Sequence, residues 1–257
     1  ELSPTATVLI CTYNRARALG ETLDSLGRMT VPAAVTWDVL VVDNNSSDDT
    51  AAVVRQRQSG FPVPLHYLHE PRQGKSYALN TGLAAGRSAF VVFTDDDVVV
   101  ELGWLEAAIA PMLADSTIDY TAGPVSPIWE APCPRWLDRH HGDLWGTIAI
   151  QDHGPSPFVY EERQRVPLGV NMAVRRALIE GAWSYRHLPR IGPAKRYIHE
   201  RVPPTVRDVA AKAQARLCAR YRVLSGKGKK LTVTVTALAR ELAGFVWAIG
   251  KEVKVAA

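Results

Sequence analysis

The chain has 257 residues, of which 47% are hydrophobic and 22% charged, and its net charge is +4. These values are ordinary for a globular protein, and the length suffices for one large domain with its own core. They exclude a disordered, collagen-like or coiled-coil protein, and three cysteines spaced far apart exclude a disulfide scaffold or a zinc finger.

The first 125 residues alternate between β-rich and helical segments. Short apolar runs predict strands at 7–11, 39–42, 65–68, 89–93 and 119–122. Apolar spacing and helix-end signals predict helices at 19–26, from about 47 with Asp48 and Asp49 in its first turn, at 76–85 closed by Gly86, and at 102–113. This alternation indicates an α/β fold in which helices flank a mostly parallel sheet.

The rest of the chain follows a different pattern. Residues 124–167 are rich in proline and tryptophan and show little periodicity, which is typical of irregular segments over a sheet edge. Residues 166–175 predict a strand that returns to the sheet. Beyond about residue 201 we expect two helices, separated by 225–228. The predicted organisation is therefore a domain of residues 1–200 and a helical extension of residues 201–257.

Polar clusters follow three of the predicted strands, at 12–14, 43–46 and 95–97. In a parallel sheet the carboxyl ends of the strands meet at one edge, and ligands bind there. We therefore expect these three clusters to lie together and to form a ligand site.

The sharpest signal is the acidic triplet Asp95-Asp96-Asp97, which follows a strongly apolar segment. In extended chain alternate side chains share a face, so Asp95 and Asp97 are expected to point one way and Asp96 the other. Two carboxylates in one cleft repel each other unless a cation lies between them. Mn²⁺ or Mg²⁺, which prefer oxygen ligands, would meet this need and would also hold phosphates. A solvated acidic turn is the structural alternative.

Two further polar residues are candidates for ligand binding. Asp43 ends a buried strand and would accept hydrogen bonds from a base or ribose, or would cap the helix that follows. Lys75 precedes a helix and would meet a phosphate, although the spacing of a P-loop is absent. For Lys75 and the neighbouring Arg72, the alternative is an ordinary surface charge.

These motifs together resemble the family 2 glycosyltransferases, which have the Rossmann-like GT-A fold. The matching segments occur in the family's order, at 8–15, 41–48, 74–82, 93–97 and 169–176. On this resemblance, residues 1–125 are the nucleotide-binding half and residues 126–200 the acceptor half. The implied reaction is an inverting transfer of a sugar from a nucleotide diphosphate, most commonly a UDP-sugar, to an acceptor hydroxyl.

The resemblance also implies residue roles. It implies a nucleotide-sugar site formed by Thr12, Tyr13, Asn14, Asp43, Lys75, Asp95 and Asp96. It implies Mn²⁺ or Mg²⁺ as cofactor, with Asp97 and Asp95 as ligands and His187 as a further candidate. The cation would neutralise charge on the leaving diphosphate.

The catalytic base of the family is usually the Asp of a Glu-Asp pair, and this chain has no such pair. The segment from residue 181 resembles the family's stretch beyond the base, so a block of residues is missing between Glu180 and Gly181. Either a loop is omitted here, which we favour, or this member lacks the usual base. The catalytic residue is thus unknown, and Glu180, Glu161 and Glu162 are poor substitutes.

Charge is distributed unevenly along the chain. Residues 181–257 contain 16 Lys and Arg against 4 Asp and Glu, whereas residues 1–180 carry a balance of −8. An amphipathic basic helix within 227–257 suits an anionic membrane surface, or packs on the domain or a second subunit. We expect no nucleic-acid partner. Without a recognisable signal peptide or membrane span, we expect a cytoplasmic protein, peripheral at the inner face of the membrane.

The expected partners are a nucleotide-diphosphate sugar donor, a glycan or lipid-linked acceptor, and a second copy in a homodimer. Two other functions compete with the transferase. A nucleotidyltransferase of nucleotide-sugar synthesis would carry a Gly-rich basic loop where this chain has Cys11 to Asn14. A non-catalytic nucleotide-sugar-binding protein would explain the missing Glu-Asp pair.

Overall fold

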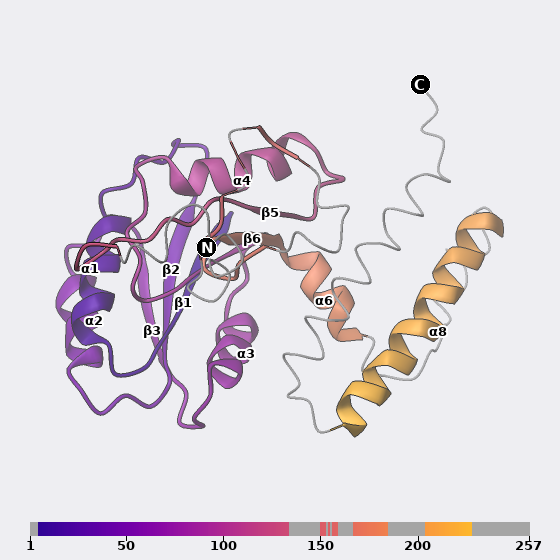
Figure 1. Cartoon of the computed structure of the whole chain (residues 1–257), viewed down its shortest axis with the longest axis horizontal. Helices are drawn as coiled ribbons and strands as arrows, with labels where there is room; N and C mark the ends of the chain where they lie inside the picture. Colours follow the sequence, from indigo (N-terminus) through magenta and orange to yellow (C-terminus); the bar gives the residue numbers. More distant parts are fainter. Residues whose placement is uncertain are drawn as a thin grey trace. The chain divides into compact units, whose positions relative to one another are not determined.

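The computed structural model describes residues 5–133, 150–152, 154, 156–158, 167–184 and 204–227 (Figure 1). The chain divides into two compact units, Glu1–Arg175 and Arg176–Ala257. The predicted boundaries, at 125/126 and 200/201, stay predictions.

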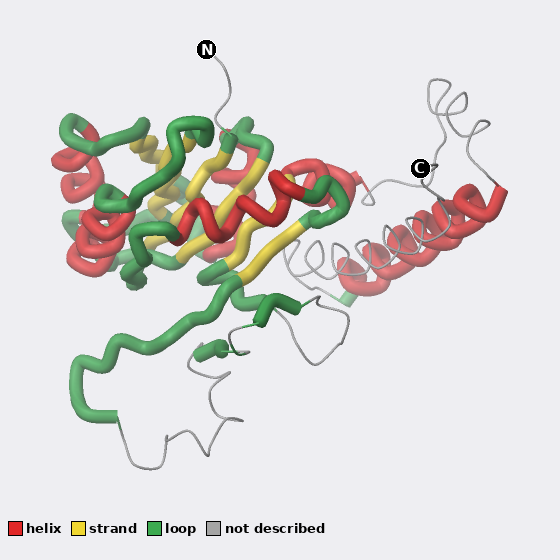
Figure 2. The backbone as a smooth tube through the Cα atoms, turned by 90° about the horizontal axis from the view of Figure 1, so that it is seen from above, coloured by secondary structure: helices red, strands yellow, loops and turns green. Residues whose placement is uncertain are grey.

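The first unit is built on one sheet, drawn in yellow in Figure 2. Its strand order is β3-β2-β1-β4-β6-β5. Its strands are β1 (Ala6–Thr12), β2 (Trp37–Asp43), β3 (Leu65–His69), β4 (Phe90–Thr94), β5 (Tyr120–Ala122) and β6 (Met172–Arg175). The first four strands are parallel, and β6 is antiparallel to β4 and β5. The predicted mostly parallel sheet is confirmed. The returning strand is shorter than predicted, because pairing begins only at Met172.

Among the described residues, four helices connect the strands of this unit. They are α1 (Ala16–Leu26), α2 (Thr50–Gln58), α3 (Lys75–Ala85) and α4 (Trp104–Ala114). One predicted helix start was wrong. Asp48 and Asp49 precede α2 instead of occupying its first turn, because Asp48 accepts hydrogen bonds from the Thr50 backbone and side chain and so turns the chain into the helix. The predicted end of α3 is confirmed: the helix ends at Ala85, and Gly86 caps it by donating its N–H to the Gly82 carbonyl at 3.0 Å.

The two faces of the sheet are covered by different helices. Alternate residues of β1, β2 and β4 pack with α1, α2 and α4 in the main core, where Leu19, Leu23 and Leu105 are fully buried. Helix α3 covers the other face and contacts β1 and β2. A Cβ at Gly82 of α3 would lie 2.4 Å from a methyl carbon of Leu9, so a side chain there would displace the buried Leu9 side chain.

In the second unit the structure describes α6 (Arg176–Ser184) and α8 (Pro204–Gly226). Helix α8 ends at Gly226, where the sequence predicts a break, and forms the described part of the C-terminal helical extension. Among the described residues, no helix has both the length and the apolar character needed to cross a membrane.

Candidate functional site

Three polar clusters meet at one edge of the sheet, as predicted. Strands β1, β2 and β4 are parallel, with Thr12 paired to Asp43 and Ile10 paired to Thr94. The clusters that follow these strands therefore leave from the same edge, which we call the carboxyl edge. The chain reverses its strand order between β1 and β4, and the crevice at such a switch point is the usual ligand site of an open α/β sheet.

The acidic triplet is divided between the two faces of the sheet. Asp95 continues the alternation of β4 on the α3 side, where its carboxylate accepts a hydrogen bond from Lys75 Nζ. On the α1 side, Nη1 of Arg15 donates to Asp97 and lies 3.6 Å from the Asp96 carboxylate. The predicted shared direction of Asp95 and Asp97 was wrong, because β4 ends at Thr94 and the chain turns at 96–97.

Burial distinguishes the three carboxylates. The side chain of Asp96 is 9% exposed, whereas that of Asp97 is 50% exposed and that of Asp95 is 32% exposed. Burial raises the pKa of Asp96, and the charge of Arg15 offsets part of that increase. Asp95 and Asp97 therefore present their charge toward solvent at the carboxyl edge, and each is neutralised by its own basic side chain.

Asp43 is buried beside Thr12 and is already engaged in hydrogen bonds. Its two carboxylate oxygens accept from the Ser46 backbone N–H at 2.9 Å and from the Tyr67 hydroxyl at 2.7 Å. Burial and the Asp43 carboxylate raise the pKa of Tyr67 to about 12, so this hydroxyl keeps its proton at neutral pH. Each carboxylate oxygen retains a lone pair, so Asp43 is held in place and still able to accept from a ligand.

The loops after β1 and β2 are tied to each other. The backbone N–H of Asn14 donates to Ser46 Oγ at 2.9 Å, and Asn14 Oδ1 accepts from the Ser47 N–H at 2.7 Å. Asn14 adopts a φ of 52°, in the left-handed region that asparagine tolerates better than most residues. The Asn14 side chain is therefore engaged in loop structure, while the neighbouring Tyr13 is 48% exposed at the edge.

Cys11 lies near the same charges but is not a nucleophile. Burial raises its pKa to about 12; the charge of Lys75 opposes this, whereas Asp95 and Asp96 add to it. The thiol therefore stays protonated at neutral pH, and thiols react as thiolates.

The segment between β3 and α3 is held by a buried carboxylate. Glu70 accepts from the Arg72 backbone and guanidinium at 2.8–2.9 Å and from Thr81 Oγ1 of α3 at 2.5 Å. These hydrogen bonds, led by those from Arg72, hold the pKa of Glu70 well below its usual range. Glu70 thus anchors the chain that leads to Lys75.

Sequence reasoning missed four residues at this edge: Arg15, Asn44, Tyr67 and Glu70. Arg15 and Asn44 stand inside two of the recognised motifs, directly beside predicted site residues. No sequence pattern identifies Tyr67, whose partner Asp43 lies 24 residues earlier in the chain. Glu70 has a near partner in Arg72, but its burial and its bond to Thr81, 11 residues later, appear only in the fold.

The acidic triplet fits a divalent cation only in part. Among the described residues, no three acidic, histidine or cysteine side chains gather closely enough to hold a metal ion. Asp95 and Asp97 still present carboxylate oxygens at the edge. Mg²⁺ is commonly bound by one or two carboxylates and completed by phosphates of the ligand, and these two residues suit that mode.

Several predicted candidate residues do not belong to the described carboxyl edge. Glu180 is an exposed residue of α6 in the second unit. The metal candidate His187, the candidates Glu161 and Glu162, and most of the tail 227–257 lie outside the described residues.

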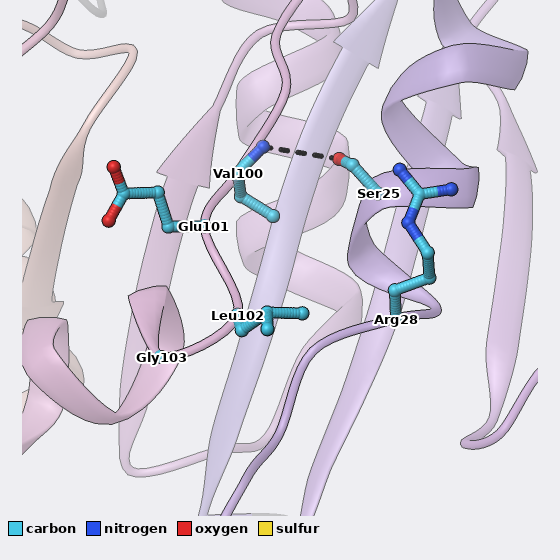
Figure 3. A pocket seen from close by; sticks show the side chains of 6 residues that line it. All are labelled: Ser25, Arg28, Val100, Glu101, Leu102 and Gly103. Atoms are coloured by element: carbon cyan, nitrogen blue, oxygen red, sulfur yellow. Dashed lines mark hydrogen bonds between the residues drawn. The ribbon is translucent and has the colours of Figure 1, made fainter.

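A hollow of about 440 Å³ lies at the other end of α1 from Arg15 (Figure 3). It is lined by Ser25, Arg28, Val100, Glu101, Leu102 and Gly103. Two of these residues are joined by a hydrogen bond from the Val100 N–H to Ser25 Oγ at 3.2 Å, and Figure 3 shows the Arg28 and Glu101 side chains on opposite sides of that bond. No residue of the carboxyl edge contributes to this hollow, so it is separate from the candidate site.

The family follows from a comparison with known protein families. The model of glycosyl transferase family 2 matches residues 7–180. This match covers more than half of the chain, and the chain therefore belongs to glycosyl transferase family 2. The predicted family is confirmed, and the match includes all three clusters of the carboxyl edge.

Curated relatives match shorter segments. A Sinorhizobium fredii protein with a provisional transposase name, y4qE, is 58% identical over 84 residues, which is 33% of this chain and 22% of that protein. Glycosyltransferase AglE of Haloferax volcanii is 30% identical over 122 residues, which is 48% of this chain and 40% of that protein. The matches thus span less than half the length of either relative.

Solved structures share the fold. Staphylococcus aureus TarS 1–349 in complex with UDP-GlcNAc has a TM-score of 0.51 and 20% identity, over 72% of this chain and 48% of that one. The mannosyltransferase PcManGT of Pyrobaculum calidifontis, in complex with GDP-Man and Mn²⁺, has a TM-score of 0.53 and 20% identity, over 95% and 70% of the two chains. The predicted GT-A fold is confirmed.

Proposed function

We propose that this protein is a divalent-metal-dependent, inverting glycosyltransferase. It takes a sugar from a nucleotide diphosphate, with a UDP-sugar as the first donor to test, and transfers it to an acceptor hydroxyl. The observation that carries this proposal is the meeting of Asp43, Lys75 and the acidic triplet at the carboxyl edge of a family 2 fold.

The nucleoside end of the donor would bind on the β2 side of the crevice. Asp43 is buried and fixed by Tyr67 and Ser46, so its free lone pairs have a defined direction. A base or ribose offers N–H and O–H donors that match such an acceptor. Thr12 and Tyr13, which end and follow β1, would complete this part of the site.

The diphosphate would bind where the basic side chains of Arg15 and Lys75 meet the acidic triplet. Both cations are partly exposed and hydrogen-bonded to carboxylates. A divalent cation held by Asp95 and Asp97 would neutralise the charge that develops on the leaving diphosphate. When Asp95 and Asp97 hold the cation, Lys75 and Arg15 can donate to phosphate oxygens instead. Charge-assisted hydrogen bonds to phosphate are as favourable for these side chains as those to carboxylate.

The acceptor hydroxyl would attack the anomeric carbon from the face opposite the diphosphate, which needs a carboxylate base within hydrogen-bond reach. We propose that the base belongs to residues absent between Glu180 and Gly181. The family match ends at Glu180, and the missing Glu-Asp pair would follow it.

The acceptor would be a glycan or a lipid-linked sugar. Exposed apolar side chains suit such a ligand: Ile128 is 73% and Trp129 is 44% exposed. These residues belong to the segment that follows β5, and tryptophan is well suited to stack on a sugar ring.

Contact of the tail 227–257 with an anionic membrane surface, at the inner face of the membrane, and pairing of two copies remain part of this proposal. The charge balance of residues 181–257, with 16 Lys and Arg against 4 Asp and Glu, supports the membrane contact. Co-sedimentation with vesicles of anionic lipid, before and after deletion of 227–257, tests the membrane contact. Equal sedimentation of both forms would contradict it.

A non-catalytic nucleotide-sugar-binding protein is the second candidate, favoured only by the absence of a Glu-Asp pair. Sequencing the expressed gene across Glu180–Gly181 separates the two. A Glu-Asp pair in an inserted segment supports the transferase, whereas an uninterrupted join supports the binding protein.

Calorimetric titration of UDP and of GDP, each with and without Mn²⁺, tests the proposed donor site. We expect one nucleotide to bind, and to bind more tightly with the metal. Absence of binding by both nucleotides in all conditions would overturn the proposal.

A further inference from the structure

Asn44 is a buried side chain at the carboxyl edge whose hydrogen bonds all lead to one segment. It follows β2 and is 4% exposed. Its Nδ2 donates to the carbonyl oxygens of Glu70 at 3.2 Å and Arg72 at 2.7 Å. Its Oδ1 accepts from the Gly74 N–H at 2.7 Å, so the side-chain amide contacts both ends of the segment 70–74.

The backbone of Asn44 adds a fourth bond, because its carbonyl accepts from Gln73 Nε2 at 2.9 Å. Strand alternation explains this arrangement. Val42, two residues earlier, faces α3, and Asn44 follows on the same side as the chain that enters α3. Since Asn44 is anchored to β1 through its N–H to the Thr12 carbonyl at 2.9 Å, it joins segment 70–74 to the centre of the sheet.

The segment that Asn44 holds ends directly at Lys75. Gly74 has a φ of 136°, which L side chains rarely adopt, and its carbonyl accepts from the Tyr77 N–H at 2.8 Å. Lys75 is the first residue of α3 and donates to Asp95. A shift of Gly74 therefore also moves the Cα of Lys75, from which its side chain extends.

We propose that Asn44 is a positioning residue that fixes Lys75 at the site of the donor diphosphate. This inference rests on the proposed role of Lys75 in donor binding. Glu70 also holds this segment, through Arg72 and through Thr81 in the second turn of α3, but the Gly74 N–H, next to Lys75, donates to Asn44. The Lys75 side chain itself is 61% exposed, so its own contacts fix it little.

Two measurements on the full chain test the inference. The first is hydrogen exchange at the Gly74 amide in Asn44→Ala, which we expect to be faster by on the order of tenfold because the acceptor of that N–H is lost. The second is a double-mutant cycle on the Kd for the nucleotide that binds the wild type, UDP or GDP, in the presence of Mn²⁺.

In that cycle Lys75→Ala and Asn44→Ala should each weaken nucleotide binding by on the order of tenfold, the size of one charge-assisted hydrogen bond. The double variant should bind no more weakly than Lys75→Ala alone. Gln58→Ala is the matched control, because Gln58 also donates a side-chain amide to a backbone carbonyl, that of Leu65 at 2.9 Å, at the start of β3. It should leave the Kd unchanged.

The outcomes separate the inference from the proposed function. If Lys75→Ala leaves the Kd unchanged, the role of Lys75 in the proposed function fails; if it weakens binding and Asn44→Ala does not, only the inference fails. The inference is also overturned if Asn44→Ala weakens nucleotide binding by the same factor in the wild type and in the Lys75→Ala variant. If Asn44→Ala does not fold, Gly74→Ala replaces it, because a Cβ there is strained by the φ of 136° and displaces the same joint.

Discussion

The two sides of the carboxyl edge carry the same kind of ion pair on different supports. On the α3 side, Lys75 and Asp95 stand on a segment held by the buried side chains of Asn44 and Glu70. On the α1 side, Arg15 reaches Asp97 with both side chains about half exposed. Both ion pairs are partly exposed and therefore screened by salt, since the Lys75 side chain is itself 61% exposed. The difference lies in the buried hydrogen bonds that fix the backbone beneath Lys75. The α3 side thus holds Lys75 in a defined position, whereas the Arg15 side chain on the α1 side is free to adjust to a charged ligand.

The largest expected effect on nucleotide binding is that of removing Asp97 from the acidic triplet. Asp97→Ala should remove the Mn²⁺-dependent part of nucleotide binding, because the remaining carboxylates would not hold the ion in place. Binding without metal should persist, since Arg15 is then released from its partner. Asp115→Ala is a control, because this carboxylate bonds Thr117 beyond the end of α4. A variant Asp97→Ala whose affinity still rises with Mn²⁺ would contradict the assignment.

The next effect compares the two cations. Lys75→Ala should weaken nucleotide binding by on the order of tenfold in ~0.1 M salt, because buried hydrogen bonds fix the backbone that carries it. The effect should be smaller in ~1 M salt, where the Debye length is only ~3 Å, because the Lys75 side chain is 61% exposed. Arg15→Ala should weaken binding about threefold in ~0.1 M salt and hardly at all in ~1 M salt. The measurement is the Kd of each variant by calorimetry at both salt concentrations. Equal losses from the two variants in ~0.1 M salt would remove the contrast between the two sides.

Glu70 offers a pH test of the α3 side. Its pKa is lowered in the folded state, so its stabilising contribution is present above the unfolded value of about 4.3 and is lost as the pH falls through the folded value. The wild type should therefore lose stability in acid, and Glu70→Gln should lose less over the same pH range. Urea unfolding at pH 7 and pH 3.5 measures this. Equal losses for both forms would show that the Glu70 charge does not support segment 70–74.

Much of the fold could be predicted from the sequence because its signals are local. The buried strands are short apolar runs, and the polar clusters follow them directly, so the carboxyl edge emerges from the order of segments alone. The division of the acidic triplet could not be predicted, because it depends on where β4 ends. Extended chain through Asp97 would have kept Asp97 on the side of Asp95.

The residues that hold the site in place, Asn44 and Glu70, could not be predicted from the sequence. Asn44 and Glu70 act on a segment that folding brings beside β2, with 28 to 30 residues between Asn44 and its partners Arg72 and Gly74. Asparagine and glutamate occur in many roles, and only the hydrogen bonds in the folded protein identify these two as supports of segment 70–74. The catalytic base is a different case, because neither the sequence nor the described residues contain the expected Glu-Asp pair.

The smallest expected effect concerns Tyr67, which supports Asp43 on the nucleoside side of the edge. Tyr67→Phe removes one hydrogen bond to a carboxylate that keeps another from Ser46, so nucleotide binding should weaken only about threefold. Because the pKa of Tyr67 is raised to about 12, its stabilising contribution is complete below about pH 10 and is lost as the pH rises toward 12. The stability difference between wild type and Tyr67→Phe should therefore shrink between pH 9 and pH 12 in thermal unfolding. A constant difference would mean that the hydroxyl does not donate to Asp43, and the fixed acceptor on the nucleoside side would then need another support.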